Sequence, residues 1–250
     1  MNLFLLLKKF IYAAIFCLVM LSSAQADNTI ILTSLEWPPY TGANLPGNGE
    51  STVTVREAFS AMGYNVIFRF LPWKRAVRSA KAYPLIVGYF PEYFSKSREK
   101  EFIYSNSIGC SPLGLLTRKN DPIVWDKLDD LAKYKLGLVS GYINTASFDN
   151  WVTKGKMNID YAQTDKSNIK KLIRARIQGV VIDRNVYNYI STASEDLAKH
   201  RKDLVFSGKL LGTNKLYICF SRDSEGIRFA RIFNEGLKRI GADHSNDVCK

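Results

Sequence analysis

Residues 29–40 read Thr-Ile-Ile-Leu-Thr-Ser-Leu-Glu-Trp-Pro-Pro-Tyr, an apolar run that leads directly into an aromatic and proline-rich segment. The part from Thr29 to Thr33 has the length and the β-branched content of a buried strand. Open α/β sheets present their ligands at the carboxyl ends of strands, and Trp37-Pro38-Pro39-Tyr40 follows this end. We therefore expect the first strand of an α/β sheet, with a stiff aromatic wall where a ligand would bind.

The residues after this segment continue an alternation of helix and strand. Val55, Phe59 and Met62 share one helical face of residues 51–62, and Gly63 follows this helix. The remaining expected elements of this half are a strand at 65–70, a helix at 74–82 and a strand at 85–88. The βαβ order predicts a largely parallel sheet that is covered by helices.

The alternation restarts after the polar segment 118–122, which indicates a second lobe. The elements expected in this lobe are a strand at 136–139, a helix at 144–152, a basic helix at 167–177 and a buried strand at 179–182. Near the end of the chain, residues 216–220 are strand-like. Helical spacing up to Gly241 is shown by Phe229, Ile232, Phe233 and Leu237.

The first 26 residues have the pattern of a cleavable export signal. Lys8 and Lys9 precede an apolar run at 10–21, and Ala24-Gln25-Ala26 supplies the small-x-small pattern of a cleavage site. A membrane anchor is the alternative, but the run is shorter than the roughly 20 apolar residues that span a bilayer. We expect residues 1–26 to be a signal peptide and the mature chain to begin at Asp27 in the periplasm.

The composition is that of a globular protein with one or two domains. A chain of 250 residues with 46% hydrophobic and 23% charged residues excludes the disordered, collagen and multi-span membrane classes. Loss of Lys8 and Lys9 with the leader lowers the formal net charge from +12 to +10, because residues 1–26 contain no acid. Export and scattered basic residues argue against nucleic acid and favour anionic ligands or contact with anionic envelope material.

Histidine and cysteine are too scarce for the common catalytic and metal sites. The only histidines, His200 and His244, have no partner at metal-ligand spacing, so we expect no metal and no cofactor. Three cysteines remain after the leader, at spacings that fit no zinc motif: Cys110, Cys219 and Cys249. An oxidising compartment permits one disulfide and leaves one thiol, and the sequence leaves the pairing open.

Trp73 and Asp183 are the strongest further candidates for a ligand site. Trp73 follows Leu71-Pro72 at the end of another predicted strand, so it would join Trp37 in an aromatic-lined site. The alternative is that both tryptophans fill the edge of the core. Asp183 ends the buried strand 179–182, where it would either face a ligand or cap the following helix.

Two loop segments offer weaker candidates. Gly141-Tyr142-Ile143-Asn144-Thr145 joins a strand to a helix, where free backbone N–H groups can receive an anion. Arg98 lies in the charged segment 95–100, where a solvated arginine is the alternative.

The order of these features resembles the bacterial extracellular solute-binding proteins of family 3, periplasmic receptors for polar amino acids that serve ABC importers. The resemblance spans about residues 30–237. The aromatic-x-Pro-aromatic motif of the family, whose first aromatic covers the ligand, is matched by Trp37-Pro38-Pro39-Tyr40. The arginine that clamps the ligand α-carboxylate precedes the Ser of Phe-Ser or Tyr-Ser by seven residues, as Arg98 precedes Ser105.

In the second lobe, the resemblance assigns further carboxylate contacts to residues 141–144, including Tyr142 and Asn144, and the α-amino contact to Asp183. A guanidinium forms two charge-assisted hydrogen bonds with a carboxylate in a planar geometry that lysine cannot copy. Arg98 and Asp183 would lie on different lobes, so each gains its full interaction only when the cleft closes and water leaves.

Two departures from the family pattern concern the amine and side-chain subsites. Ile86 stands where members of the family often carry Asp, and Phe90-Pro91-Glu92-Tyr93 replaces small hydroxyl residues. Glu92 could take over amine binding or favour a cationic side chain, and a solvated loop glutamate is the alternative. Tyr93 could narrow the pocket or pack in the core.

The resemblance implies an α/β fold of the two-lobed periplasmic-binding-protein-like type II, with the ligand cleft between the lobes. We expect lobe 1 to comprise residues 27–116 and 220–250, and lobe 2 residues 117–219. The two crossings then fall at 112–119 and 216–222. The implied function is the capture of a small amino acid or derivative by cleft closure, without catalysis, by a monomer that serves an ABC permease.

Two alternatives use the same fold. A ligand-sensing module would pass its closed form to a membrane receptor, and the neighbouring genes would distinguish it from a transport protein. A periplasmic dehydratase acting on cyclohexadienyl amino acids would need an acid over the ligand, and Glu92 is the only unassigned acid near the expected site.

Overall fold

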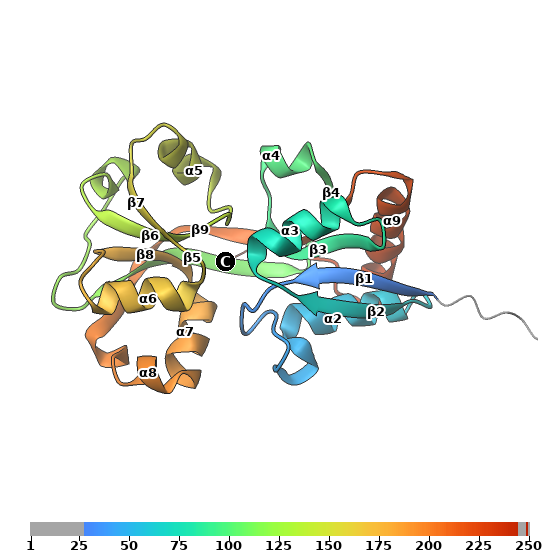
Figure 1. The fold of residues 1–250 in the computed structure, drawn as a ribbon, viewed down its shortest axis with the longest axis horizontal. Coiled ribbons are helices and arrows are strands. Elements are labelled where there is room, and N and C mark those ends of the chain that lie inside the picture. The colour runs from blue at the N-terminus through green and yellow to red at the C-terminus, as the bar shows by residue number, and fades with distance from the viewer. Residues whose placement is uncertain (1–27, 245–248, 250) are drawn as a thin grey trace, which may run out of the picture.

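A computed structural model describes residues 28–244 and 249, which form two α/β lobes that share one mixed sheet (Figure 1). The sheet has nine strands in the order β2-β1-β3-β9-β5-β8-β6-β7, with β4 paired to β9. The predicted signal peptide, residues 1–26, lies outside the described residues. None of the helices in the described part combines the length and apolar character that a membrane crossing needs.

Lobe 1 contains the first four strands and the C-terminal helix. Its elements are β1 (Thr29–Ser34), η1 (Pro46–Asn48), α2 (Glu50–Ser60), β2 (Asn65–Phe70), α3 (Trp73–Ala82), β3 (Ile86–Tyr93), α4 (Lys96–Glu99), β4 (Phe102–Tyr104) and α9 (Ser224–Arg239). β1 pairs in parallel with β2 and with β3, which is the predicted βαβ arrangement.

Lobe 2 contains the middle of the chain. Its elements are η2 (Leu128–Leu131), β6 (Lys135–Val139), α5 (Ala146–Thr153), β7 (Asn158–Ala162), α6 (Asp165–Ile173), β8 (Gly179–Asp183), α7 (Arg184–Ala193), α8 (Glu195–Ala198) and η3 (Arg201–Asp203). β6 pairs in parallel with β7 and with β8.

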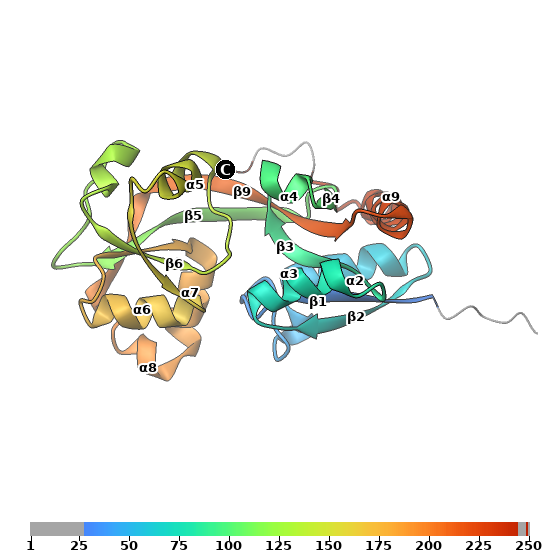
Figure 2. The ribbon, with the colours of Figure 1, turned by 45° about the horizontal axis from the view of Figure 1, so that its top comes forward.

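Two long strands, β5 (Gly109–Arg118) and β9 (Leu204–Ser221), connect the lobes. They run side by side between the lobes (Figure 2) and pair antiparallel from Gly109 opposite Leu216 to Arg118 opposite Leu204. β5 pairs with β8 in lobe 2, whereas the end of β9 pairs with β3 and β4 in lobe 1. The expected lobe boundaries at 116/117 and 219/220 both fall inside these two strands.

The prediction of a largely parallel sheet is wrong for the strands at the connection. The chain enters lobe 2 through β5 and returns through β9, so the two neighbours must run in opposite directions, and both pair antiparallel with their other partners. The strand expected at 216–220 is the end of β9, which begins at Leu204. The helix expected at 167–177 is α6, which begins at Asp165 and ends at Ile173.

The core of lobe 1 lies where α2 and α9 cover the sheet. Phe59 from α2 and Phe233 from α9 are fully buried, and their rings lie 5.1 Å apart. The two helices approach so closely that a Cβ atom at Gly236 would lie 2.1 Å from the carbonyl oxygen of Ala58. This contact therefore requires glycine at position 236. The close contact at Gly236 packs α9, the last helix of the described chain, against α2 in lobe 1.

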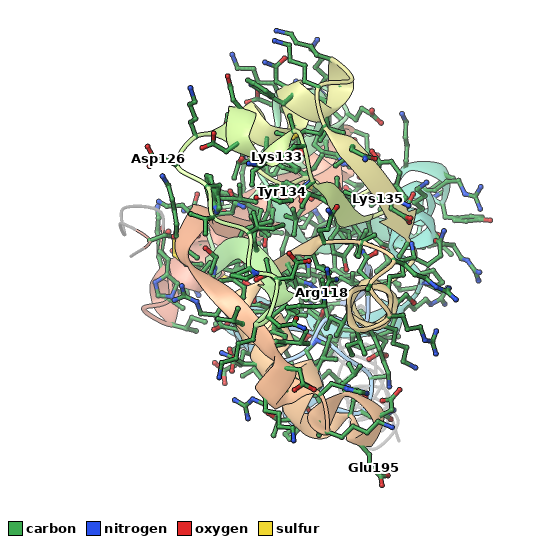
Figure 3. The ribbon with its side chains drawn as sticks, turned by 90° about the vertical axis from the view of Figure 1, so that its left-hand side faces the viewer. Arg118, Asp126, Lys133, Tyr134, Lys135 and Glu195 are labelled. Atoms are coloured by element: carbon green, nitrogen blue, oxygen red, sulfur yellow. A yellow bond between two sulfur atoms is a disulfide. The ribbon has the colours of Figure 1, made fainter. Side chains whose placement is uncertain are left out.

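Arg118 lies at the outer end of lobe 2, which faces the viewer in Figure 3. Arg118, at the end of β5, donates to the carbonyl oxygens of Leu172 at 3.1 Å and Ile177 at 2.7 Å. Asp126 and Glu195 project outward at the edges of this view. Arg118 thus joins a connecting strand to the end of α6.

Cys110 and Cys249 form a disulfide, a pairing that the sequence does not determine, and Cys219 is a buried free thiol. The bond attaches residue 249 to β5, one of the two connecting strands. No cluster of three or more potential metal ligands occurs among the described residues.

Candidate functional site

A narrow cavity lies between the lobes, at the carboxyl ends of β1 and β3. Its lining residues come from both lobes: Leu35, Trp37, Trp73, Pro91, Glu92, Tyr93, Tyr142 and Ile143. The volume of the cavity that the centre of a water molecule can occupy is only about 20 Å³. Pockets that hold small molecules typically measure about 300–1,000 Å³, so the cavity in this structure is much smaller than such a pocket.

Trp37 and Trp73, the two predicted aromatic residues, both lie in this cavity and are each 6% exposed. Trp37 follows β1, and its ring stacks on Tyr40 with centroids 4.7 Å apart. Trp73 is the first residue of α3, and its ring meets Tyr142 of lobe 2 edge to face at 5.9 Å. The tryptophans therefore contribute to the buried core and to the wall of the cavity at the same time.

The loop after β6 brings lobe 2 into contact with these rings. Gly141 has a φ of 88°, a left-handed conformation that glycine adopts without strain. Its carbonyl oxygen accepts a 2.9 Å hydrogen bond from Nε1 of Trp73, which joins the two lobes. Asn144 is directed elsewhere, because its side chain donates to Asp149 at 2.8 Å and does not line the cavity.

Asp183 is both a helix cap and a contact between the lobes. One carboxylate oxygen accepts the backbone N–H of Val186 at 2.8 Å, as the capping alternative expects. The other accepts the hydroxyls of Ser111 and of Tyr40, the latter from lobe 1 at 3.1 Å. Ser111 is also bonded to the Tyr93 hydroxyl. A buried polar chain thus runs from Tyr93 through Ser111 to Asp183.

Arg98 is paired within lobe 1 and does not line the cavity. Its Nε donates to Glu92 at 3.0 Å, and the two side chains are 19% and 3% exposed. Glu92 also accepts the Tyr89 hydroxyl at 3.0 Å and the backbone N–H of Tyr93 at 3.1 Å. The alternative of a solvated loop glutamate is therefore wrong, because Glu92 lies in the buried strand β3 and reaches the cavity.

Asp165 is a site residue that the sequence reading did not identify. It is the first residue of α6, is 5% exposed and accepts the Tyr142 hydroxyl at 3.3 Å. Nε1 of Trp37 lies close enough to favour the ionised form of Asp165, although it makes no hydrogen bond of normal geometry. Asp165 follows the strand β7, just as Trp37 follows β1 and Asp183 ends β8. This position after a strand is the signal that could have identified it.

Burial changes the acidity of the carboxyl groups around the cavity. Desolvation raises the pKa of Glu92 to about 7, against the opposing effect of Arg98. Desolvation also raises the pKa of Asp165 to about 7, and it raises the pKa of Asp183. Among the described residues, neither Asp165 nor Asp183 has an ion-pair partner. The site therefore holds more acid groups than nearby cations.

The stability of the protein is expected to fall as the pH rises from 5 to 8. Asp165 binds a proton in the folded chain up to a pKa of about 7, whereas the unfolded chain releases it near its ordinary value of 3.8. The folded state thus binds more protons in this window, and the free energy of unfolding decreases with pH. Urea unfolding should show that Asp165→Asn removes on the order of 3 kcal/mol of this decrease. The exposed control Asp126→Asn should leave it unchanged, and equal pH profiles for both variants would contradict the assignment.

Two wider grooves flank the narrow cavity and share Tyr142 with it. One, of about 770 Å³, passes between the start of α3 and helices α6 and α7, and includes Glu36, Arg75 and Asp165. The other, of about 560 Å³, lies between the segment 94–97 and helix α5. The interface between the lobes is therefore open at both sides and closed at its aromatic centre.

Neither a protein-family model nor a curated protein matches the sequence at a significant level. Many solved structures nevertheless share the fold. A histidine kinase sensor domain with similarity to periplasmic binding proteins aligns with a TM-score of 0.72 at 17% identity, over 85% of this chain and 91% of that chain.

Two further likenesses are to amino-acid-binding proteins. An ancestral arginine-binding protein bound to arginine aligns with a TM-score of 0.71 at 14% identity, over 88% of this chain and 95% of that chain. The substrate-binding protein of an amino acid ABC transporter aligns with a TM-score of 0.67 at 14% identity, over 88% and 96%. The two lobes, the connecting strands and these likenesses together show that the chain has a two-lobed periplasmic-binding-protein-like α/β fold, as the sequence resemblance implied.

Proposed function

We propose that this chain is a periplasmic solute-binding protein that captures a small amino-acid-like ligand between its lobes and delivers it to an ABC importer. The observation that carries the proposal is the cavity at the centre of the interface. It is lined by Trp37 and Trp73 from lobe 1 and by Tyr142 from lobe 2. A ligand held there contacts both lobes and therefore favours the closed arrangement over an open one.

The contacts between the lobes describe how closure would be coupled to binding. The hydrogen bonds from Trp73 to Gly141 and from Tyr40 to Asp183 join side chains and backbone that belong to different lobes. Opening breaks these bonds and exposes the aromatic walls, while the paired strands β5 and β9 keep the lobes attached. The narrow cavity requires such opening before a ligand enters.

Support for an amino-acid-like ligand comes from charged groups behind the walls of the cavity, which itself is lined by Glu92 as its one charged residue. Arg98 uses only Nε for Glu92, and its two terminal nitrogens make no hydrogen bond to any described residue. They remain donors for a carboxylate, as the proposed clamp needs. Asp183 and Asp165 supply acceptors for an amine from the lobe 2 side. Two of the likenesses in fold, one to an arginine-bound protein and one to the substrate-binding protein of an amino acid transporter, agree with this class of ligand.

Thermal shift and tryptophan fluorescence test the proposal. The chain has four tryptophans, and Trp125 and Trp151 line none of the three pockets between the lobes. A Trp125→Phe/Trp151→Phe variant therefore reports only on the cavity. A ligand at 100 times its Kd should stabilise this variant by about 2.7 kcal/mol and change its fluorescence. Trp37→Ala should abolish both responses. The proposal fails if no amino acid or derivative stabilises the protein, or if Trp37→Ala binds as well as its parent.

An enzyme on the same fold is the second candidate, because Glu92 is an acid at the cavity with a pKa raised to about 7. Both of its oxygens already accept hydrogen bonds, which suits a fixed acceptor better than a proton donor. Turnover of arogenate or prephenate by the purified protein would establish the enzyme. A sensory module differs from a transport protein only in its partner, which the neighbouring genes identify.

A further inference from the structure

The walls of the cavity form an aromatic box with one charged side chain. Four of the eight lining residues are aromatic, and Glu92 is the only charged residue among them. The rings do not lie in one stack: Tyr142 meets Trp37 at 82° and Trp73 at 88°, and Tyr93 meets Trp37 at 70°. Rings at right angles present both faces and edges to the space between them. Aromatic faces carry negative electrostatic potential and attract cations.

The groups behind these walls are also acidic. The hydroxyl of Tyr142 donates to Asp165, and Tyr93 is linked through Ser111 to Asp183. With Glu92, three carboxyl groups surround the box, and the only cation paired with any of them in the described part of the chain is Arg98. When all of these groups are ionised, the buried set has a formal charge of −2. Such an excess of buried negative charge is unfavourable, so these carboxyl groups either retain protons, as their raised pKa values indicate, or are compensated by a positive group.

We infer that the ligand carries an organic cation, a guanidinium or alkylammonium group, which lies in the box of Trp37, Trp73, Tyr93 and Tyr142 and faces Glu92. This inference rests on the proposed function and names the chemistry of its ligand. The cation supplies the missing positive charge and contacts the ring faces, and its desolvation is offset by both interactions. A neutral group of equal shape would gain the packing alone.

Two pairs of isosteric compounds separate charge from shape. Arginine and citrulline differ chiefly by the charge of the side chain, and choline and 3,3-dimethylbutan-1-ol differ by the charge of the head group. Calorimetric titration should show that, within a pair that binds, the charged member binds at least about 30-fold more tightly, the factor for 2 kcal/mol. Equal affinity of the charged and neutral members, or stronger binding of glutamate than of any cation, overturns the inference.

The variant Glu92→Gln keeps the shape and an acceptor for Arg98 but removes the charge at the box. This variant should bind the charged compound at least tenfold more weakly than the parent protein and bind the neutral compound with unchanged affinity. Glu101→Gln is the matched control, because Glu101 pairs with Lys81 on the exposed surface of lobe 1. It should not alter either affinity. An equal loss for the charged and neutral compounds in Glu92→Gln would mean a structural role for Glu92 and would contradict the inference.

The same experiments distinguish the two levels of the proposal. Tight binding of a neutral or acidic amino acid would support the solute-binding function and reject a cationic ligand. Failure of every amino acid, derivative and amine to bind would reject both.

Discussion

Replacement of Arg98 by alanine is expected to lower the free energy of unfolding by about 3–5 kcal/mol, the usual cost of removing one partner of a buried ion pair. Glu92 is 3% exposed and Arg98 is its only ion-pair partner in the described part of the chain. The variant leaves the carboxylate with the hydroxyl of Tyr89 and the backbone N–H of Tyr93. These neutral donors do not compensate the charge of Glu92, so its carboxyl group should be protonated more readily in the variant.

A double-mutant cycle separates the pair from the loss of side-chain volume. Arg98→Met keeps most of the aliphatic contact and still strands the charge of Glu92, so it should be nearly as destabilising as Arg98→Ala. Adding Glu92→Gln to Arg98→Met removes the stranded charge and should restore at least about half of the loss, because replacing both partners of a buried pair is often close to neutral. Urea unfolding of the single and double variants measures the coupling. Additive effects would show that the two side chains do not act as a pair.

The same variants test the proposed carboxylate clamp. If Arg98 only orders lobe 1, the stable double variant binds the ligand as tightly as the single variant Glu92→Gln. If its free terminal nitrogens hold the ligand carboxylate, the double variant remains folded and binds at least about 30-fold more weakly than Glu92→Gln alone, since losing a buried charged partner costs 2 kcal/mol or more. Calorimetry on the double variant therefore distinguishes folding from recognition.

The fold could be predicted where the chain has strong local periodicity. The strand at 65–70 and the buried face of α2 around Val55 and Phe59 follow from alternation and helical spacing. The two connecting strands, β5 and β9, are harder to predict from the sequence. β5 contains Pro112, which usually indicates an edge or a loop, and the first half of β9 is mostly half-buried or exposed and shows no regular alternation of buried and exposed residues. Their strand structure comes from pairing with each other across the molecule, which no local pattern reports.

The site shows the same division. Trp37 and Trp73 could be placed at the sheet edge because each follows a recognisable strand. The pairing of Arg98 with Glu92 could not be predicted, because it depends on the turn that connects the end of β3 to α4. Asp165 was overlooked because the strand before it, β7, is half exposed and has a weak apolar pattern. Whether these residues bind a ligand stays a prediction, which the titrations above address.

Loss of the disulfide between Cys110 and Cys249 is expected to lower the free energy of unfolding by about 4–5 kcal/mol, because the bond closes a long loop. The two residues are 139 positions apart in the sequence, so the bond closes more than half of the chain into one loop and restricts its unfolded state. The variant to measure is Cys110→Ser/Cys249→Ser, which leaves no unpaired partner. Urea unfolding without reductant compares it with the parent protein.

Reduction provides an independent control for this prediction, because Cys219 is a free thiol buried in β9. A reducing agent should destabilise the parent protein to the level of the double variant and should leave the double variant unchanged. Burial raises the pKa of the Cys219 thiol, so the folded parent should react slowly with thiol reagents at this position. In the unfolded, unreduced parent, Cys219 should be the reactive one of the three described cysteines. Two results would contradict the argument: a parent whose stability does not respond to reductant, or an unfolded, unreduced chain with three reactive thiols. Either would mean that the C-terminal cysteine does not hold β5 and that the paired strands alone maintain the connection between the lobes.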